Sequence, residues 1–323
     1  KVAMDLFGYK KHDWNEHWID MPKFHIPTRD TEKRNAVDVS DVECIANQNT
    51  SILPKYSIYI ISKGRHNNPK TAMALKGMNI PFKIVVEPKE YKEYSKVIDE
   101  KNIITTTENF SEKGCGGIPV RNFVMEYSKK RGEKKHWILD DNIGGFGYQK
   151  TGRRINTKTN GDFFRQCEDF VDRYSNIKMA GIRYRFHHNY VKSPYYLNTR
   201  IYSCILIDNS IKHKWRGKYN EDTDLSLRVL KDGDCTMLLT WCYCNKAGTL
   251  SMKGGNTDDL YAKTHNRKEF AESLQKQHED VVKVVWRYNR WHHEVNYKPF
   301  RNNELLRERV LSSGLKSKFV IVN

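Results

Sequence analysis

The stretch HWILDDN at residues 136–142 decides the expected fold, because a short apolar run passes directly into two carboxylates and an amide. A second apolar run, SIYII at residues 57–61, passes in the same way into the polar stretch SKGR at 62–65. Short, nearly continuous apolar runs are typical of strands that are covered on both faces. We therefore expect two buried strands, each followed directly by polar residues.

The first half of the chain alternates strands with helices. Besides the two strands above, we expect strands at 82–86 and 103–105 and helices after Asn68, near 89–98 and over 120–130. This alternation predicts an α/β protein with a doubly wound sheet. Ligands of such sheets bind outside the carboxyl ends of the strands, so the residues that follow the strands are the candidates for a site.

The second half of the chain has a mixed pattern. We expect helices over 161–175, 223–230 and 267–287, the last one long and amphipathic, and strands over 177–186, 200–208 and 237–243. The expected organisation is an N-terminal arm over 1–50, two halves of a core over 51–150 and 151–265, and a helical, basic C-terminal extension over 266–323.

The chain of 323 residues is strongly basic, with 56 Lys and Arg against 39 Asp and Glu and a net charge of +17. Such an excess is typical of proteins that bind polyanions. Nucleic acid is the first candidate and an acidic membrane surface the second, while a basic surface without a specific ligand stays open. With 38% hydrophobic residues the chain has enough apolar side chains for a core, which argues against a disordered protein.

No apolar run approaches the roughly 18 residues that cross a bilayer, so we expect no membrane-spanning segment. The first residues lack the pattern of a secretory signal, and the seven cysteines are odd in number and scattered. Both observations predict a reducing, cytoplasmic location. Cys242 and Cys244 lie in an expected strand without a second pair at zinc spacing, so we interpret them as structural thiols.

Asp140, Asp141 and Asn142 stand at the carboxyl end of an expected buried strand. Their oxygens suit Mg²⁺ or Mn²⁺, which bind a diphosphate through one or two carboxylates. The alternative is a solvated turn, because Asp and Asn are ordinary turn residues. The position after an apolar strand favours the metal.

Two basic stretches are candidates for holding a phosphate group. Ser62, Lys63 and Arg65 follow the first strand, and Gly116, Gly117 and Arg121 lie where the helix over 120–130 begins. Glycines before a helix let backbone N–H groups approach a phosphate, and arginines donate to its oxygens. The chain has neither a dinucleotide fingerprint nor a P-loop, which argues against ordinary dehydrogenases and P-loop kinases.

Three carboxylates, Glu221, Asp222 and Asp224, stand where the short helix over 223–230 is expected to begin. One of them is explained as a helix cap. A cap needs one acid, so the other two favour a catalytic group that takes a proton from an acceptor hydroxyl. We expect Asp222 to be this base.

Cations alternate with aromatic side chains in two segments, 181–190 and 286–293. This mixture suits contact with a phosphate backbone together with stacking on an exposed base. The expected DNA-binding residues are Arg183, Arg185, Arg287 and Arg290, with Arg153 and Arg154 beside the acidic triplet. The alternative is that the aromatic rings fill the core and the charges are solvated.

Four of these motifs together resemble a known family. SKGR at 62–65, LDDN at 139–142, EDTD at 221–224 and MKGGN at 252–256 are similar to motifs of the phage glycosyltransferases associated with TET/JBP-type base hydroxylases. The resemblance covers roughly residues 55 to 260. It implies a GT-A-like α/β fold with a mixed sheet, in which 51–150 is the nucleotide-sugar-binding half and 151–265 the acceptor-binding half.

The resemblance also implies an activity: the transfer of a sugar from a UDP-sugar to 5-hydroxymethylcytosine in DNA. Glucose is the expected sugar. If a phage encodes the protein, the expected location is the host cytoplasm. The acidic triplet would then hold the donor ribose and a divalent metal, Asp222 would be the base, and Gly254 and Gly255 would let the backbone approach donor or acceptor. One departure is Asn142, where many GT-A enzymes have Asp. A protein, glycan or lipid acceptor, and a catalytically silent DNA-binding module, stay open as alternatives.

Overall fold

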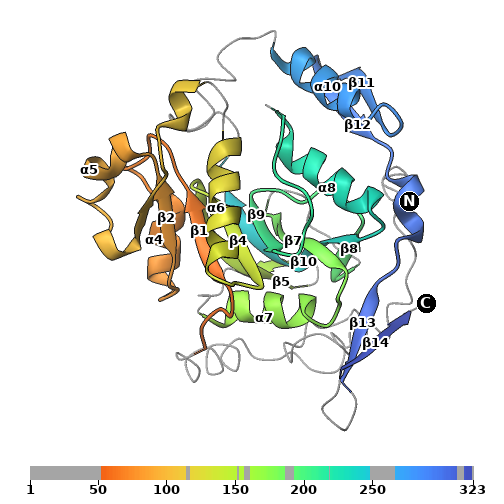
Figure 1. Cartoon of the computed structure of the whole chain (residues 1–323), viewed down its shortest axis with the longest axis horizontal. Helices are drawn as coiled ribbons and strands as arrows, with labels where there is room; N and C mark the ends of the chain where they lie inside the picture. The colour runs from red at the N-terminus through yellow and green to blue at the C-terminus, as the bar shows by residue number, and fades with distance from the viewer. Residues whose placement is uncertain are drawn as a thin grey trace.

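The computed structural model (Figure 1) describes residues 52–113, 117–150, 153–155, 161–185, 193–217, 219–247, 266–310 and 316–321. Within these ranges, only the backbone is described for residues 113, 149–150, 153–155, 266, 308–310 and 316–321. The expected N-terminal arm lies outside the described residues.

The first half of the chain forms four parallel strands in the spatial order β3-β2-β1-β4. The strands are β1 (Ser57–Ile61), β2 (Lys83–Val86), β3 (Ile103–Thr105) and β4 (Lys135–Asp140). The helices between them are α4 (Lys70–Gly77), α5 (Tyr91–Tyr94) and α6 (Ile118–Lys130), with the 3₁₀ turns η1 (Pro88–Glu90), η2 (Glu100–Asn102) and η3 (Phe110–Lys113). All four expected strands are confirmed. The helix expected near 89–98 is shorter than predicted, because only the single turn of α5 continues from η1.

The second half adds antiparallel strands and two helices. Its elements are β5 (Ile143–Lys150), β6 (Arg153–Ile155), α7 (Asp162–Val171), β7 (Ile177–Tyr184), β8 (Tyr195–Leu197), β9 (Cys204–Asp208), α8 (Glu221–Lys231) and β10 (Cys235–Lys246). They extend the sheet to ten strands in the order β3-β2-β1-β4-β9-β7-β10-β5-β6, with β8 paired to β10. Because β9 runs antiparallel to both β4 and β7, the sheet is mixed, as the GT-A-like prediction requires.

Helices cover both faces of the sheet, which explains the continuous apolar runs. On one face, α4 and α7 pack with Ile58, Ile60 and Trp137 of β1 and β4. On the other face, α6 and α8 pack with Tyr59 and Ile138. Alternate residues of a strand point to opposite faces, so a strand that is buried on both faces needs an apolar side chain at nearly every position.

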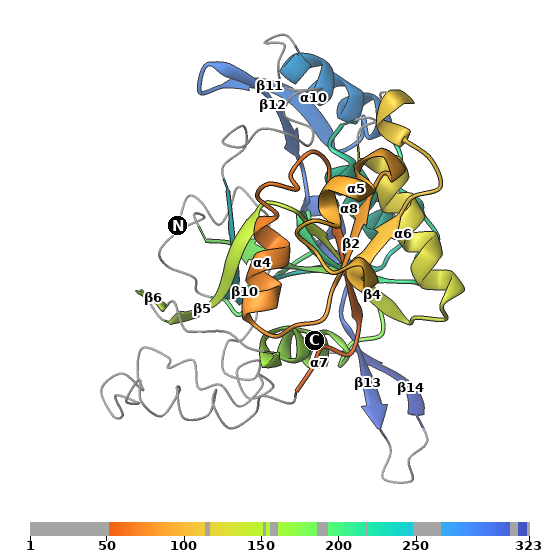
Figure 2. The same cartoon turned by 90° about the vertical axis from the view of Figure 1, so that its left-hand side faces the viewer.

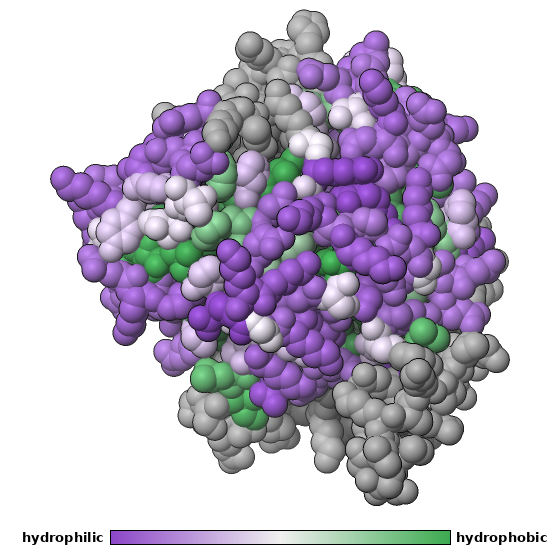
Figure 3. Space-filling model, in the orientation of Figure 1, coloured by the Kyte–Doolittle hydropathy of each residue, from purple (hydrophilic) through white to green (hydrophobic). Residues whose placement is uncertain are grey.

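The cysteines of the described residues are consistent with structural thiols. Cys242 and Cys244 lie on the central strand β10 and are buried and unoxidised, as are Cys167, Cys204 and Cys235. Among the described residues, no helix has the length and apolar character needed to cross a membrane. The face seen in Figure 3 is mostly hydrophilic, and its hydrophobic side chains form small separate areas.

The C-terminal extension is not one long helix. Helix α10 (Asn266–Gln277) is followed by the hairpin of β11 (Val282–Arg287) and β12 (Arg290–Val295), the 3₁₀ turn η4 (Lys298–Asn302), and the hairpin of β13 (Leu306–Val310) and β14 (Lys316–Ile321). Figures 1 and 2 place α10 with β11–β12 at one end of the molecule and β13–β14 at the other.

The prediction of a helix over 267–287 is therefore wrong in its second half. The residues after α10, VVKVVW at 281–286, are mainly β-branched, and such side chains favour strands. Tyr288 and Asn289 then adopt left-handed backbone angles, with φ of 53° and 55°. Two such residues in succession make the tight turn that matches the twist of a two-stranded hairpin.

Candidate active site

The candidate site lies at the carboxyl ends of β1 and β4, which are neighbours in the sheet. Their register pairs Ile61 with Asp140, so the residues that follow both strands come together. Thr71 of α4 fixes the turn after β4, because its hydroxyl donates to the carbonyl of Asp140 at 2.6 Å and accepts from the backbone N–H of Ile143 at 2.9 Å. Thr71 is fully buried, so this turn is held from inside the protein.

Asp141 is held by the basic loop after β1. Ser62 Oγ donates to Asp141 Oδ2 at 2.8 Å, and Arg65 forms an ion pair with Asp141 Oδ1. Ser62 Oγ also lies 2.6 Å from the hydroxyl of Tyr94, which accepts from the backbone N–H of Arg65 at 3.1 Å. Burial raises the pKa of Asp141 and outweighs the opposing effect of Arg65. Two of the expected donor-binding residues, Ser62 and Arg65, therefore contact the acidic triplet directly.

Asp140 lies between two cations. Arg121 Nη2 donates to Asp140 Oδ1 at 3.1 Å, and Lys246 Nζ donates to Asp140 Oδ2 at 2.6 Å. Burial works to raise the pKa of Asp140, but the charges of Lys246 and Arg121 outweigh it and hold the pKa well below its usual range. Asp140 is therefore a carboxylate with both oxygens engaged.

Arg121 joins the two acidic motifs. Besides Asp140, its guanidinium lies 3.5 Å from Glu221 Oε1 and 3.8 Å from Asp222 Oδ1, both in the first turn of α8. It also lies 4.9 Å from the ring centre of Trp215. The side chain of Arg121 is only 5% exposed, so these charges meet in a largely buried place where electrostatic interactions are strong.

The environment of Asp222 suits a base. Burial raises the pKa of Asp222, Glu221 and Asp140 add to the rise, and Arg121 and Lys246 oppose it, with a resulting pKa of about 7. Its Oδ1 is buried without a hydrogen-bond partner. A carboxyl group with a pKa near neutrality exchanges protons readily at physiological pH, which is the property that a general base needs.

Several buried polar atoms of Arg121, of residues in contact with it and of the acidic triplet have no hydrogen-bond partner. These are Arg121 Nε and Nη1, Trp215 Nε1, Asp222 Oδ1 and Asn142 Oδ1. Unpaired buried polar groups are uncommon in folded proteins and cost free energy unless something satisfies them. Two of these atoms, Arg121 Nη1 and Trp215 Nε1, carry N–H groups that fit an anionic ligand such as a diphosphate, while Arg121 Nε lies 3.5 Å from Glu221 Oε1.

Asp224 lies in a different set of contacts from Asp222 and Glu221. Its carboxylate accepts from Arg216 at 3.0 Å, Arg228 at 2.6 Å and His278 at 2.8 Å, and it is fully buried. Burial works to raise the pKa of Asp224, but the bonds from His278 and the two arginines lower it to about 2. Asp224 therefore ties α8 to the residue that follows α10 and does not share the contacts of Arg121.

Residues 140–142 do not fit a divalent cation in this arrangement. Both oxygens of Asp140 are bonded to cations, and those of Asp141 are bonded to Arg65 and Ser62. Only Asn142 Oδ1 is left unpaired, and one amide oxygen is a weak site for Mg²⁺ or Mn²⁺. Within the described ranges, no group of three His, Cys, Asp or Glu side chains is placed to hold a metal ion.

The glycines of the expected donor site are only partly described. Gly117 is the residue before α6, and its carbonyl accepts from the backbone N–H of Arg121 at 3.0 Å. The backbone N–H of Lys63 donates to Asp141 Oδ2 at 3.4 Å. Gly116, Gly254 and Gly255 lie outside the described residues, so their predicted role stays a prediction.

The expected DNA-binding residues lie in different places. Arg183 is only 6% exposed, so it lies in the interior rather than on a DNA-binding surface, and Arg185 lies 5.9 Å from the ring centre of Tyr243. The side chains of Arg153 and Arg154 are outside the described residues. Arg287 and Arg290 lie in the β11–β12 hairpin, where Arg287 is half exposed and pairs with Glu294 at 3.1 Å.

The β11–β12 hairpin presents aromatic side chains to solvent. Trp286 is 55% exposed and packs edge-on against Trp291, while Tyr288 at the turn is 87% exposed. Helix α10 packs against both strands of the hairpin and also contacts the residues before α8. There, Asn220 Nδ2 donates to the carbonyl of Phe270 at 2.8 Å. The hairpin is therefore connected through α10 to the start of the helix that carries Asp222.

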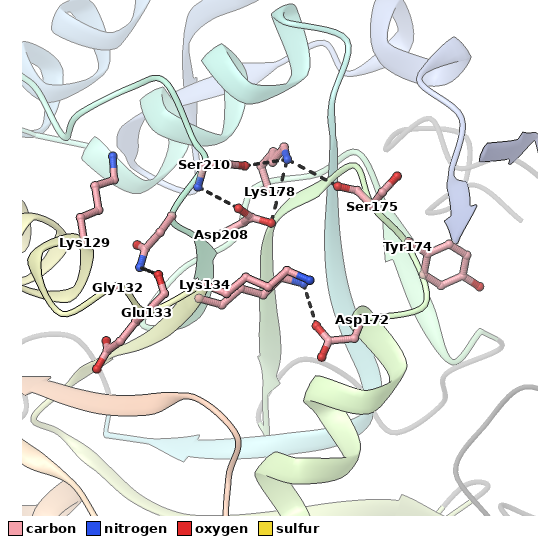
Figure 4. Close-up of a pocket in the computed structure, with 12 residues that line it drawn as sticks. Lys129, Gly132, Glu133, Lys134, Asp172, Tyr174, Ser175, Lys178, Asp208 and Ser210 are labelled. Atoms are coloured by element: carbon pink, nitrogen blue, oxygen red, sulfur yellow. Dashed lines mark hydrogen bonds and ion pairs between the residues drawn. The ribbon is translucent and has the colours of Figure 1, made fainter. Parts of the chain in front are cut away.

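A cavity of about 500 Å³ lies at the opposite edge of the sheet (Figure 4). It is lined by the start of β4 and the end of β9, including Lys135 and Asp208. Its charges are largely paired, with Lys135 Nζ 2.8 Å from Asp172 and Lys178 Nζ 2.8 Å from Ser210 Oγ. It lacks the unpaired donors found beside Arg121, so we do not assign the active site to it.

Sequence reasoning missed several residues of the site. Lys246, Thr71, Tyr94 and Trp215 come from parts of the chain without a motif, and their roles depend on contacts between distant segments. The one signal for Lys246 was its position at the end of a long apolar run, where a lysine is equally typical of an ordinary strand end.

Comparison with known proteins identifies one matching family. The sequence profile of a family described as TET-Associated Glycosyltransferase matches residues 56–255. The matched range includes the acidic triplet, Arg121, the start of α8 and Lys246, and it ends before α10. A search of curated proteins found no significant match.

Proposed function

Because the chain belongs to the TET-associated glycosyltransferase family, we propose that it transfers a sugar from a nucleotide-sugar donor to the hydroxyl of 5-hydroxymethylcytosine in DNA. UDP-glucose is the first donor to test. The family supports a transferase that acts on modified DNA bases, and the proposal adds the donor, the sugar and the base.

One observation carries the proposal: Arg121 brings the end of β4 and the start of α8 to a single guanidinium group. Asp140 and Asp222 thereby both contact the buried guanidinium of Arg121; we propose that the first lies at the donor site and that the second meets the acceptor. Diphosphate binding beside a carboxyl group with a pKa near neutrality is what glycosyl transfer to a hydroxyl needs.

In the proposed reaction, Asp222 takes the proton from the hydroxymethyl group as its oxygen bonds to the anomeric carbon of the sugar. The bond between that carbon and the diphosphate oxygen breaks, and its electron pair leaves with the nucleoside diphosphate. We propose that the guanidinium of Arg121, whose Nη1 has no hydrogen-bond partner, stabilises this developing negative charge. Asp140 holds Arg121 in position.

The DNA acceptor is supported by charge and by the C-terminal hairpin. The net charge of +17 favours a polyanion, and the exposed side chains of Trp286 and Tyr288 stand beside Arg287 and Arg290. Aromatic rings and cations together suit stacking on bases and contact with phosphates. Because the site lies largely buried at Arg121, we expect the modified nucleotide to leave the duplex, at a cost of a few kcal/mol.

The test is mass spectrometry of an oligonucleotide with one 5-hydroxymethylcytosine after incubation with protein and a panel of UDP-sugars. We expect an added hexose mass with one donor, no product with the matched cytosine oligonucleotide, and product formation slower by on the order of 100-fold or more with the Asp222→Asn variant. Donor hydrolysis that hydroxymethylated DNA does not stimulate would favour a protein, glycan or lipid acceptor. Absence of any product, together with absence of UDP-sugar binding, would favour a catalytically silent DNA-binding module.

A further inference from the structure

The ammonium group of Lys246 lies in a complete set of acceptors. It donates to Asp140 Oδ2 at 2.6 Å, to Ser203 Oγ at 2.5 Å and to the hydroxyl of Tyr184 at 3.3 Å. It also lies 5.3 Å from the ring centre of Tyr184. An ammonium group has three N–H donors, and here each of them has an acceptor.

The backbone around Lys246 is arranged to keep this geometry. Pairing of β10 with β5 places Lys246 opposite Ile143, next to the turn that carries the acidic triplet. Ser203 is 2% exposed and has a left-handed φ of 63°, and its carbonyl accepts from the backbone N–H of Asp140 at 2.8 Å. A non-glycine residue keeps such a conformation only where its surroundings impose it, and such residues are common at functional sites.

A divalent cation at Asp140 would have to displace one of two cations. Arg121 bonds to one oxygen and Lys246 to the other, while the oxygens of Asp141 are taken by Arg65 and Ser62. Asn142 stands where a third carboxylate would strengthen a metal site. The carboxylates that the GT-A-like fold commonly uses to bind a metal therefore bond here to the side chains of lysine and arginine.

We propose that Lys246 takes the place of the divalent cation at Asp140, and that sugar transfer by this protein needs no metal. This inference rests on the proposed function and deepens it. The role of a metal is divided between two side chains. Lys246 neutralises Asp140 and fixes its orientation as a positioning residue, and Arg121 contacts the diphosphate through its unpaired N–H groups. The electron pair of the broken bond leaves on a diphosphate that faces a guanidinium rather than a metal.

The first experiment measures metal binding and activity of the wild-type protein. We expect sugar transfer to hydroxymethylated DNA to be unchanged by excess EDTA, and UDP to bind in EDTA by calorimetry. Electron paramagnetic resonance of added Mn²⁺, with UDP present, is expected to show no tightly bound ion. Loss of transfer in EDTA that Mn²⁺ restores, or one Mn²⁺ bound tightly per chain, would overturn the proposal.

The second experiment substitutes the lysine. Lys246→Met keeps the length of the side chain but leaves Asp140 Oδ2 without its cation. We expect transfer to fall about 100-fold, as when one charged donor is removed from a site of this kind. We also expect the variant to gain a Mn²⁺ resonance signal and to recover part of its activity with Mn²⁺. Such a gain of metal response distinguishes the proposal from a merely structural role, which would not produce it.

Two further variants serve as controls. Lys178→Met removes a cation that lies 3.9 Å from Asp208, at the edge of the sheet away from the site, and is expected to leave activity and metal response unchanged. Should Lys246→Met fail to fold, Lys246→Arg keeps the charge and is expected to resist EDTA; an EDTA-sensitive Lys246→Arg enzyme would contradict the proposal.

The outcomes separate this inference from the proposed function. If UDP-sugars bind in EDTA, no DNA is modified with or without Mn²⁺, and no Mn²⁺ is bound tightly, the acceptor assignment fails and the metal inference stands. If UDP-sugars bind only with Mn²⁺, the metal inference fails and the donor assignment stands. If no UDP-sugar binds under either condition, the proposed function fails, and Mn²⁺ resonance of the wild-type protein still decides whether Asp140 accepts a metal.

Discussion

Asp222→Asn should abolish most of the activity and, at alkaline pH, make the protein more stable. The pKa of Asp222 is raised from 3.8 to about 7 in the folded protein, first by burial and then by Glu221 and Asp140. Asp222 therefore stays protonated to a higher pH in the folded protein than in the unfolded chain. Asparagine resembles the protonated form and cannot ionise, so it removes both the base and the cost of a buried charge.

The sign and size of the stability effect follow from this shift. Below the unfolded value of 3.8, Asp222 is protonated in both states and the variant gains little. As the pH rises from there to about 7, the wild-type protein loses stability, because only the unfolded chain releases this proton freely. At 1.36 kcal/mol for each pKa unit, the difference approaches about 4 kcal/mol above neutrality, as an order of magnitude.

Urea denaturation of both proteins at pH 5 and pH 8, and the pH profile of kcat/KM, test this reasoning. We expect the stability gain of Asp222→Asn to be about 2.5- to 3-fold larger at pH 8 than at pH 5. The wild-type kcat/KM should rise with pH through about 7, and the variant should lose on the order of 100-fold or more in kcat/KM. As a matched control, Asp99→Asn changes a carboxylate that is 66% exposed and should alter neither measurement. An equal stability gain at both pH values, or an unchanged pH profile in the variant, would refute the assignment of Asp222.

Three further predictions concern other parts of the molecule. Arg121→Lys should weaken UDP binding in calorimetry by about 10- to 100-fold, because an ammonium cannot replace the forked guanidinium; unchanged affinity would exclude Arg121 from the donor site. Asp224→Asn should lower the free energy of unfolding by about 3 to 5 kcal/mol, since it breaks a buried pair with Arg228, and a loss below about 1 kcal/mol would contradict the pairing. Trp286→Ala should weaken DNA binding in fluorescence anisotropy at every salt concentration. Arg287→Ala should weaken it too and should also reduce the slope of log affinity against log salt concentration by about 1. If neither variant changes the DNA affinity, the hairpin is not part of the interface.

The assignment of the site to the edge near Asp140 follows from the order of the strands. In a sheet ordered β3-β2-β1-β4, the chain passes from β1 to β2 on one side of β1, and it later adds β4 on the other side of β1. Loops at the carboxyl ends of β1 and β4 then diverge, which opens a place for a ligand between them. Ser62 and Asp141 occupy these two loops and are bonded to each other.

The local sequence was sufficient to predict the four strands of the first half and the position of the acidic motifs, whereas it did not predict several strands of the second half, such as β5 and β11. Apolar runs such as 57–61 and 136–139 identify buried strands because every position of a strand covered on both faces needs an apolar side chain. The residues after such a strand must lie at its carboxyl end, so Asp140 and Asp141 were assigned to the correct edge. The family resemblance is confirmed by a match over residues 56–255, which holds the motifs at 62–65, 139–142 and 221–224 and most of the one at 252–256.

Only the tertiary structure decided which charges meet. Asp222 and Asp224 are two residues apart, yet one lies beside Arg121 and the other is bonded to Arg228 and His278, because successive positions of a helix face different neighbours. The partnership of Lys246 with Asp140 depends on the pairing of β10 and β5, and no local pattern encodes the register between distant strands. A sequence records which charged side chains are present, whereas the packing of the sheet determines which oxygen each of them neutralises.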